Sequence, residues 1–268
     1  MSDRKRFYEI RDRRSVEYGV PSVFDQPIQV FVGSDAASNV SGQYVVLSLV
    51  NMLARLHHRI ALQIPPAPLL VNCMNLRADT LGATSILLAK SVDPFIDLSI
   101  PNEPCGVAIG VGAKAPHGLP WYICWDHQIA FLDREPYQYP MNHSRVSLGA
   151  ALAACLGAGN ILKQVLSLPN RPVRLSACNL REGRDAKKGP QLVDSVNVGD
   201  ALIVGGGGVG SCLAYWTHLF GYRGNWCYVD GDIAELNDAN RCLGILPIDC
   251  GWPATSARMK SEIAAELT

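Results

Sequence analysis

A glycine-rich segment in the C-terminal third of this 268-residue chain has the pattern of a phosphate-binding loop. Gly205, Gly207 and Gly210 match G-x-G-x-x-G directly after the apolar residues 201–204 and before a helical pattern. Glycine permits a tight turn at such a junction, and the backbone N–H groups that begin the helix can face a phosphate. The alternative is a glycine loop that serves only close packing.

The polar residues that follow favour nucleotide binding. A second apolar run ends at Asp230, twenty residues after Gly210, where a carboxylate can accept a hydrogen bond from a ribose hydroxyl. Asp232, Asn240 and Arg241 come within the next residues. A cation beside the phosphates suits phosphoryl or adenylyl transfer better than hydride transfer, since it neutralises charge that develops on the phosphate oxygens. An NAD-dependent oxidoreductase stays open as an alternative, as does a solvated loop in place of a site.

Three segments together resemble the adenylation domain of ubiquitin-activating enzymes and their bacterial ThiF and MoeB relatives: IVGGGGVGS, VDGDIAELNDANRC and DCGWPATSARMKSEIAAEL. The resemblance implies that Arg241 contacts the ATP phosphates and that Lys260 begins the next helix as a second catalytic cation. The cofactor-binding residues that it implies are Gly205, Gly207, Gly208, Gly210, Asp230, Asp232 and Asn240.

The sequence departs from the family pattern at a few positions. The family's first asparagine falls on Asp238 and its glutamine on Cys242, and extra residues separate Gly251 from Lys260. Neither Cys242 nor Cys250 is expected to carry a thioester, because the family's cysteine comes later in the chain, beyond an aspartate that binds magnesium.

The activity implied by the resemblance is ATP-dependent adenylation of the C-terminal carboxylate of a ubiquitin-like protein. ATP and Mg²⁺ are the implied cofactors, with the magnesium ligand expected outside this chain and no metal site within it. The implied partners are the ubiquitin-like protein, a conjugating-enzyme-like protein of a bacterial conjugation pathway, and a homodimer or a pairing of two adenylation-like domains. A catalytically inactive scaffold of the same fold is a further alternative.

The composition argues against several other classes of protein. With 24 basic and 24 acidic side chains, the chain has no global field to attract nucleic acid or an anionic membrane. Its nine cysteines are scattered and odd in number, which is typical of reduced thiols in the cytoplasm. We find no signal-peptide pattern and expect no membrane span. The six histidines show no metal-ligand spacing, and His57 and His58 are interpreted as a helix C-terminal cap.

Alternating strand and helix patterns must position these residues. Strands are expected at residues 28–35 and 59–65, on either side of a helix at 41–58, as a right-handed βαβ unit. Further patterns predict helices at 82–95 and 148–166 and strands at 96–100, 105–112 and 172–180, with a strand pair at 121–133 that turns near Asp126 and His127.

The expected fold class is α/β, with two Rossmann-like ThiF-type domains in tandem, the second incomplete in this chain. Residues 1–25 are interpreted as an arm, 26–180 as a degenerate, inactive adenylation-like domain, 181–200 as a linker, and 201–268 as the ATP-binding beginning of the active domain. The first domain lacks the glycine pattern, and its second strand ends without an acid at Gln63. Because two strands alone are not stable, the second unit requires a longer chain, the first sheet or a partner.

The basic N-terminal segment DRKRFYEIRDRR is interpreted as a solvated amphipathic arm. By the resemblance, its arginines Arg11, Arg13 and Arg14 are also hypothesised to reach a neighbouring active site.

Overall fold

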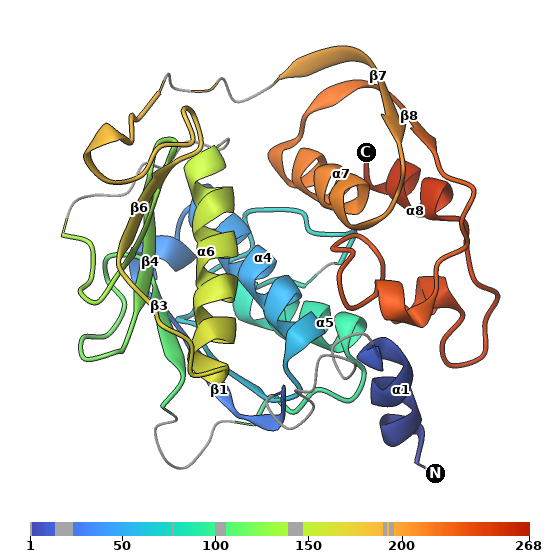
Figure 1. Cartoon of the computed structure of the whole chain (residues 1–268), viewed down its shortest axis with the longest axis horizontal. Helices are drawn as coiled ribbons and strands as arrows, with labels where there is room; N and C mark the ends of the chain where they lie inside the picture. The colour runs from blue at the N-terminus through green and yellow to red at the C-terminus, as the bar shows by residue number, and fades with distance from the viewer. Residues whose placement is uncertain are drawn as a thin grey trace.

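The computed structural model describes residues 2–13, 24–76, 78–99, 106–138, 147–189, 192 and 196–268. Their named strands form a six-stranded sheet and a separate two-stranded sheet (Figure 1). Arg14, which lies in the proposed arm, falls outside the described residues.

The six-stranded sheet has the order β2-β1-β3-β4-β5-β6. Neighbouring strands from β2 to β4 are parallel, whereas β5 is antiparallel to both β4 and β6. This mixed sheet, with helices packed on it, confirms the α/β class. The strands are β1 (Ile28–Val32), β2 (Ile60–Gln63), β3 (Ala108–Val111), β4 (Tyr122–Asp126), β5 (Ile129–Asp133) and β6 (Val173–Ser176).

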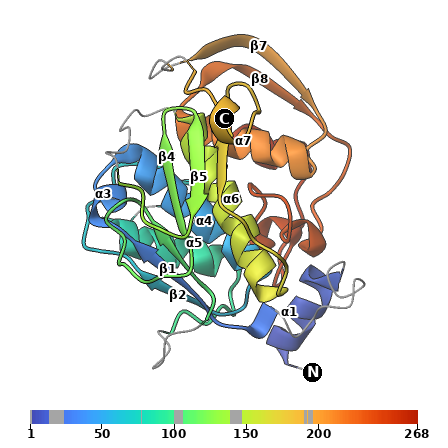
Figure 2. The same ribbon diagram turned by 60° about the vertical axis from the view of Figure 1, so that its left-hand side comes forward.

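Helices α4 (Val40–Leu56) and α6 (Leu148–Val165) lie between this sheet and the C-terminal residues, and α5 (Leu81–Val92) packs beside α4 (Figures 1 and 2). Each helix begins at a polar side chain that accepts a hydrogen bond from an amide of its first turn, namely Asn39, Ser147 and Thr80. By length and composition α6 is apolar enough to cross a membrane, yet half of it is buried and it packs on β4, β5 and α4.

The predicted βαβ unit is confirmed, but the strand expected at residues 96–100 is wrong for the residues described there. Asp97 forms only an isolated bridge to Arg59. The Asp97 carboxylate accepts hydrogen bonds from the backbone N–H and the hydroxyl of Ser99, at 2.9 and 2.6 Å. This local turn directs the backbone away from a regular sheet ladder.

The solvated arm is also a wrong prediction for its first half. Residues Asp3–Arg11 form helix α1, in which Phe7 and Arg11 are buried. The Phe7 ring packs edge-on against Phe95 and Trp252, each with a centroid distance of 5.4 Å. Aromatic burial of this kind docks α1 on the rest of the molecule.

The C-terminal unit begins with β7 (Asn197–Val204), α7 (Gly208–Phe220) and β8 (Arg223–Val229). Strand β7 therefore includes four residues that were assigned to the linker. The unit continues with two short 3₁₀ helices, η3 (Leu236–Asp238) and η4 (Pro247–Cys250), and with helix α8 (Lys260–Leu267). β7 and β8 pair in parallel and do not join the larger sheet in the described part of the chain.

The two units share one hydrophobic core across α4 and α7. The Tyr215 hydroxyl lies 3.1 Å from the Ser48 hydroxyl, and the rings of Tyr44 and Phe220 meet edge to face. The outer face of the β7–β8 pair is open instead, with Leu202, Val204 and Val229 exposed.

The openings of the two units share one close contact. Gly42 and Gly210 each occupy the third position of a helix; α7 follows β7 directly, whereas the short helix α3 (Ser34–Ala37) separates α4 from β1. A Cβ atom at Gly42 would lie 2.0 Å from the carbonyl oxygen of Ala36, and one at Gly210 would lie 1.9 Å from that of Gly205. Only glycine permits so close an approach, of α4 to the short helix α3 and of α7 to its preceding loop.

Candidate nucleotide site

The glycine loop joins β7 to α7. Gly205 has a positive φ of 97°, which favours glycine, and α7 begins at Gly208 with no side chain capping it. Space is open around Gly207 and Gly208, since a Cβ on either would have no neighbour within 4 Å. The loop therefore combines an uncapped helix N-terminus with an unobstructed approach, as a phosphate cradle requires.

Asp230 fixes this loop to the end of β8. Its carboxylate accepts hydrogen bonds from the amides of Gly206, at 2.5 Å, and Asp232, at 2.7 Å. Burial acts to raise the pKa of Asp230, but these two hydrogen bonds and nearby Lys260 outweigh it and lower the pKa. The carboxylate is thus ionised at neutral pH, and each oxygen retains a lone pair for a further donor.

Lys260 is the first residue of α8, and its side chain lies beside the carboxylates of Asp232 and Asp238. Its side chain is only 8% exposed, and its Nζ lies 3.1 Å from Asp238 and 3.4 Å from Asp232. Burial acts to lower the pKa of Lys260, but the hydrogen bonds and charges of these two carboxylates raise it overall. Lys260 therefore stays cationic at neutral pH.

Asp238 joins the two predicted cations. One carboxylate oxygen accepts from Arg241 at 2.8 Å, and the other accepts from Lys260 and from the backbone amide of Glu235, at 3.1 Å each. The side chain of Asp238 is 3% exposed, whereas that of Arg241 is 42% exposed. The sequence interpretation noted Asp238 only as a departure from the family pattern. Its position three residues after Glu235, where it caps a turn, is the local signal that was missed.

A polar cavity of about 800 Å³ lies beside these residues. Neither the glycine loop nor Asp230 lines this cavity; the loop comes nearest through Gly206, where a Cβ would lie 3.0 Å from the Cβ of the lining residue Lys260. Arg13, the residue that follows Asp12 at the end of α1, also lines the cavity. Its charged lining residues are Arg13, Asp232, Glu235, Asp238, Arg241 and Lys260.

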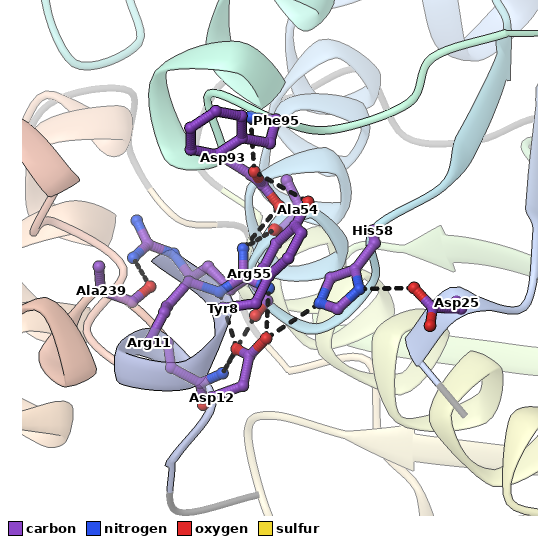
Figure 3. A network of polar contacts seen from close by, with 11 residues as sticks. Tyr8, Arg11, Asp12, Asp25, Ala54, Arg55, His58, Asp93, Phe95 and Ala239 are labelled. Atoms are coloured by element: carbon purple, nitrogen blue, oxygen red, sulfur yellow. Dashed lines mark hydrogen bonds and ion pairs between the residues drawn. The ribbon is translucent and has the colours of Figure 1, made fainter. Parts of the chain in front are cut away.

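Arg11, for which the same role was hypothesised, does not line the cavity. Arg11 is buried in ion pairs at 2.7 Å with Asp12 and with Asp93 (Figure 3). The hypothesis that Arg11 serves a neighbouring active site is therefore wrong, because its buried guanidinium is held within its own chain by the adjacent Asp12 and by Asp93.

Asn240 also points away from the cavity. Its side-chain amide donates to Asp12 at 3.0 Å and to the carbonyl of Arg55 at 3.2 Å. Its role in cofactor binding stays a prediction, because in this structure the amide serves the contact between the two units.

Cys242 and Cys250 are poor nucleophiles where they lie. Burial raises the pKa of Cys242 to about 11 and that of Cys250 to about 12, and nearby aspartates act in the same direction. Both thiols are protonated at neutral pH, which is unfavourable for thioester formation.

The corresponding loop of the N-terminal unit holds a carboxylate of its own. Asp35 follows β1 and accepts hydrogen bonds from the amides of Ala113, at 2.8 Å, and Lys114, at 3.1 Å. Strand β2 ends at Gln63, with no acid there to bind a ribose. The described residues of this unit therefore place negative charge where an anionic phosphate would need donors.

Comparison with protein-family models gives no match, and comparison with curated protein sequences gives none. Among the described residues no group of three or more His, Cys, Asp or Glu side chains is placed to hold a metal ion. The assignment of a function accordingly depends on the geometry of the site and on the sequence resemblance.

Proposed function

We propose that this chain binds ATP against Gly205–Gly210 and uses it to adenylate the C-terminal carboxylate of a ubiquitin-like protein. The observation that carries the proposal is the convergence of Lys260 and Arg241 on the buried carboxylate of Asp238, beside the glycine loop and Asp230. A paired carboxylate holds both cations in place before the anionic ligand arrives.

Each group has a distinct part in the proposed reaction. The amides at the start of α7 bind phosphate oxygens, and Asp230 accepts from a ribose hydroxyl. An oxygen of the substrate carboxylate attacks the α-phosphorus, the bond from that phosphorus to the bridging oxygen breaks, and pyrophosphate leaves. Lys260 and Arg241, with Arg13, which also lines the cavity, stabilise the charge that develops on the phosphoryl oxygens. We assign no residue of this chain to Mg²⁺.

We further propose that the N-terminal unit is an inactive copy of the nucleotide-binding unit. The close approaches at Gly42 and Gly210, each the third residue of a helix, support a common origin, and the Asp35 carboxylate near the first opening is unfavourable for an anionic nucleotide there. The pairing of two adenylation-like units, a conjugating-enzyme-like partner and a cytoplasmic location belong to this proposal.

Two alternatives make different predictions for ligand binding. An oxidoreductase binds NAD and has no dependence on ATP. A scaffold binds its protein partner equally well after Arg241→Ala. The three cations that line the cavity are matched by three carboxylates, so its charge alone does not separate ATP from NAD, and the binding measurement decides between them.

The test is equilibrium binding of ATP and NAD, followed by ATP–pyrophosphate exchange with candidate ubiquitin-like proteins. Arg241→Ala and Asp230→Ala are expected to weaken ATP binding roughly tenfold or more, as the loss of a charged hydrogen bond does. Arg59→Ala is the matched control, because Arg59 has similar exposure and pairs with Asp97 outside the cavity. Binding of NAD without binding of ATP would contradict the proposal.

A further inference from the structure

We propose that Arg55, which belongs to the N-terminal unit, is a positioning residue for Arg241. This inference rests on the proposed function, because it gives the N-terminal unit a part in binding the ATP phosphates without contact between Arg55 and the ligand.

The guanidinium of Arg55 binds the backbone of the loop that carries Arg241. It donates to the carbonyl oxygen of Ala239, at 2.6 Å (Figure 3), and to those of Leu243, at 2.7 Å, and Ile245, at 2.8 Å. These carbonyls lie on both sides of Arg241 in the chain. A planar guanidinium that reaches all three fixes the path of the loop in a way that a single hydrogen bond does not.

Asn51, one turn earlier on α4, binds both the guanidinium of Arg55 and the same loop. The side-chain oxygen Oδ1 of Asn51 accepts from Nε of Arg55 at 2.9 Å, and the side-chain Nδ2 of Asn51 donates to the backbone carbonyl of Leu243 at 3.2 Å. Asn51 thereby orients the guanidinium and adds a second donor to the same loop.

Arg55 is 1% exposed and forms no ion pair with a carboxylate in the described residues. Burial lowers the pKa of Arg55 to about 10, so it is still charged at neutral pH. A buried charge without a counter-ion is costly, and backbone carbonyls offset that cost only while the loop keeps this shape. The arrangement therefore ties the conformation of residues 239–245 to helix α4.

The opposite side of the loop is tied to the glycine segment. The amide of Gly244 donates to the hydroxyl of Ser211 at 3.0 Å, and Ser211 directly follows Gly210. Hydrogen bonds thus attach the loop of residues 239–245 to α4 on one side and to the beginning of α7 on the other. Arg241 belongs to this loop, and its guanidinium pairs with Asp238. Loosening the Arg55 side should shift Arg241 relative to the phosphate cradle.

The variant that tests this is Arg55→Lys, which keeps the charge and loses the planar set of donors. Arg59→Lys is the matched control, because it makes the same substitution near the end of α4 at an exposed ion pair. Binding of ATP and of adenosine is measured for both variants, and also for Arg241→Ala and for Arg55→Lys combined with Arg241→Ala.

The expected result is that Arg55→Lys weakens ATP binding roughly tenfold and leaves adenosine binding unchanged. In protein that already carries Arg241→Ala, the Arg55→Lys substitution should not lower the affinity for ATP further, because the two residues act through one contact. Hydrogen exchange without any nucleotide should be faster at the amides of Cys242, Gly244 and Ile245 in Arg55→Lys. Should that variant not fold, Asn51→Ala is measured in the same way.

Equal weakening of ATP and adenosine, or an additive loss in the combined variant, would show that Arg55 is only a structural residue. Unchanged ATP binding in Arg55→Lys, with ATP bound by the wild type, overturns this inference and leaves the proposed function intact. A wild-type protein that does not bind ATP overturns both. The wild-type measurement therefore separates the failure of one from the failure of the other.

Discussion

The side-chain amide of Asn240 donates to a carboxylate oxygen of Asp12 at 3.0 Å, although the two residues are 228 positions apart in the chain. Asp12 also accepts from Arg11 and from His58, at 2.7 and 2.9 Å (Figure 3). One carboxylate at the end of α1 therefore joins the N-terminal helix, the end of α4 and the loop that carries Arg241. Arg13, the next residue, lines the cavity.

Asp12→Asn is expected to lower the free energy of unfolding by about 3 kcal/mol, because it leaves the buried Arg11 short of a carboxylate partner. Urea unfolding at neutral pH measures the change. Asp3→Asn, at an exposed position of the same helix, serves as the control and should change the value by less than about 0.5 kcal/mol. An equal effect of both variants would show that Asp12 is not central to the docking of α1.

The free energy of unfolding of the wild type should decrease as the pH is lowered. In Asp12→Asn this decrease should be smaller. Burial acts to raise the pKa of Asp12, but hydrogen bonds and charges from His58 and Arg11 outweigh it and lower the pKa. A carboxyl whose pKa is lowered by folding contributes stability above its unfolded value of about 3.9, and that contribution is lost as the pH falls through the folded value. Urea unfolding between neutral pH and about pH 3 should show a shallower decline for the variant. Parallel curves would refute this assignment.

Asp238→Asn is expected to weaken ATP binding roughly tenfold, because Lys260 and Arg241 lose the charge that holds them together. The amide keeps the size of the side chain, so the fold should be retained. Calorimetric titration with ATP measures the effect, and Asp200→Asn, at an exposed position on β7, is the control. Unchanged affinity would mean that the two cations do not meet the phosphates as a pair.

Gly210→Ala should reduce both stability and ATP binding. Its Cβ would lie 1.9 Å from the carbonyl of Gly205, so the loop must move, at a cost of about 1–3 kcal/mol. Gly207→Ala is the contrasting variant, since its Cβ would meet nothing within 4 Å. Thermal unfolding and ATP titration of both variants test the prediction, which fails if the two alanines behave alike.

The sequence predicts the elements of this fold better than their tertiary contacts. Periodicity and turn residues are local, so the βαβ unit and the glycine loop were found where expected. The attachment of Asn240 to Asp12 links residues from opposite parts of the chain, and no local pattern encodes it. His58 was interpreted with His57 as a helix cap; His57 is the C-cap residue of α4, but His58 pairs with Asp12 and Asp25.

Arg55 was missed for a related reason. Its partners are mostly backbone carbonyls, and every residue has a carbonyl, so the amino-acid types in the partner loop carry no trace of the contact. By contrast, Asp230 and Lys260 are suggested by residue types and spacing that resemble a known pattern, and their roles toward a ligand stay predictions. A contact to backbone carbonyls thus leaves no sequence signal of the kind that a pattern of side-chain types provides.

The open face of the β7–β8 pair also affects how the described part of the chain behaves at high concentration. Leu202, Val204 and Val229 are 64%, 76% and 51% exposed on a sheet of only two strands. The formal net charge of the chain is zero, so molecules that approach one another meet no long-range repulsion. Strand edges and apolar side chains together favour adhesion between molecules. Colloidal stability should therefore depend on this small surface more than on the rest of the exterior.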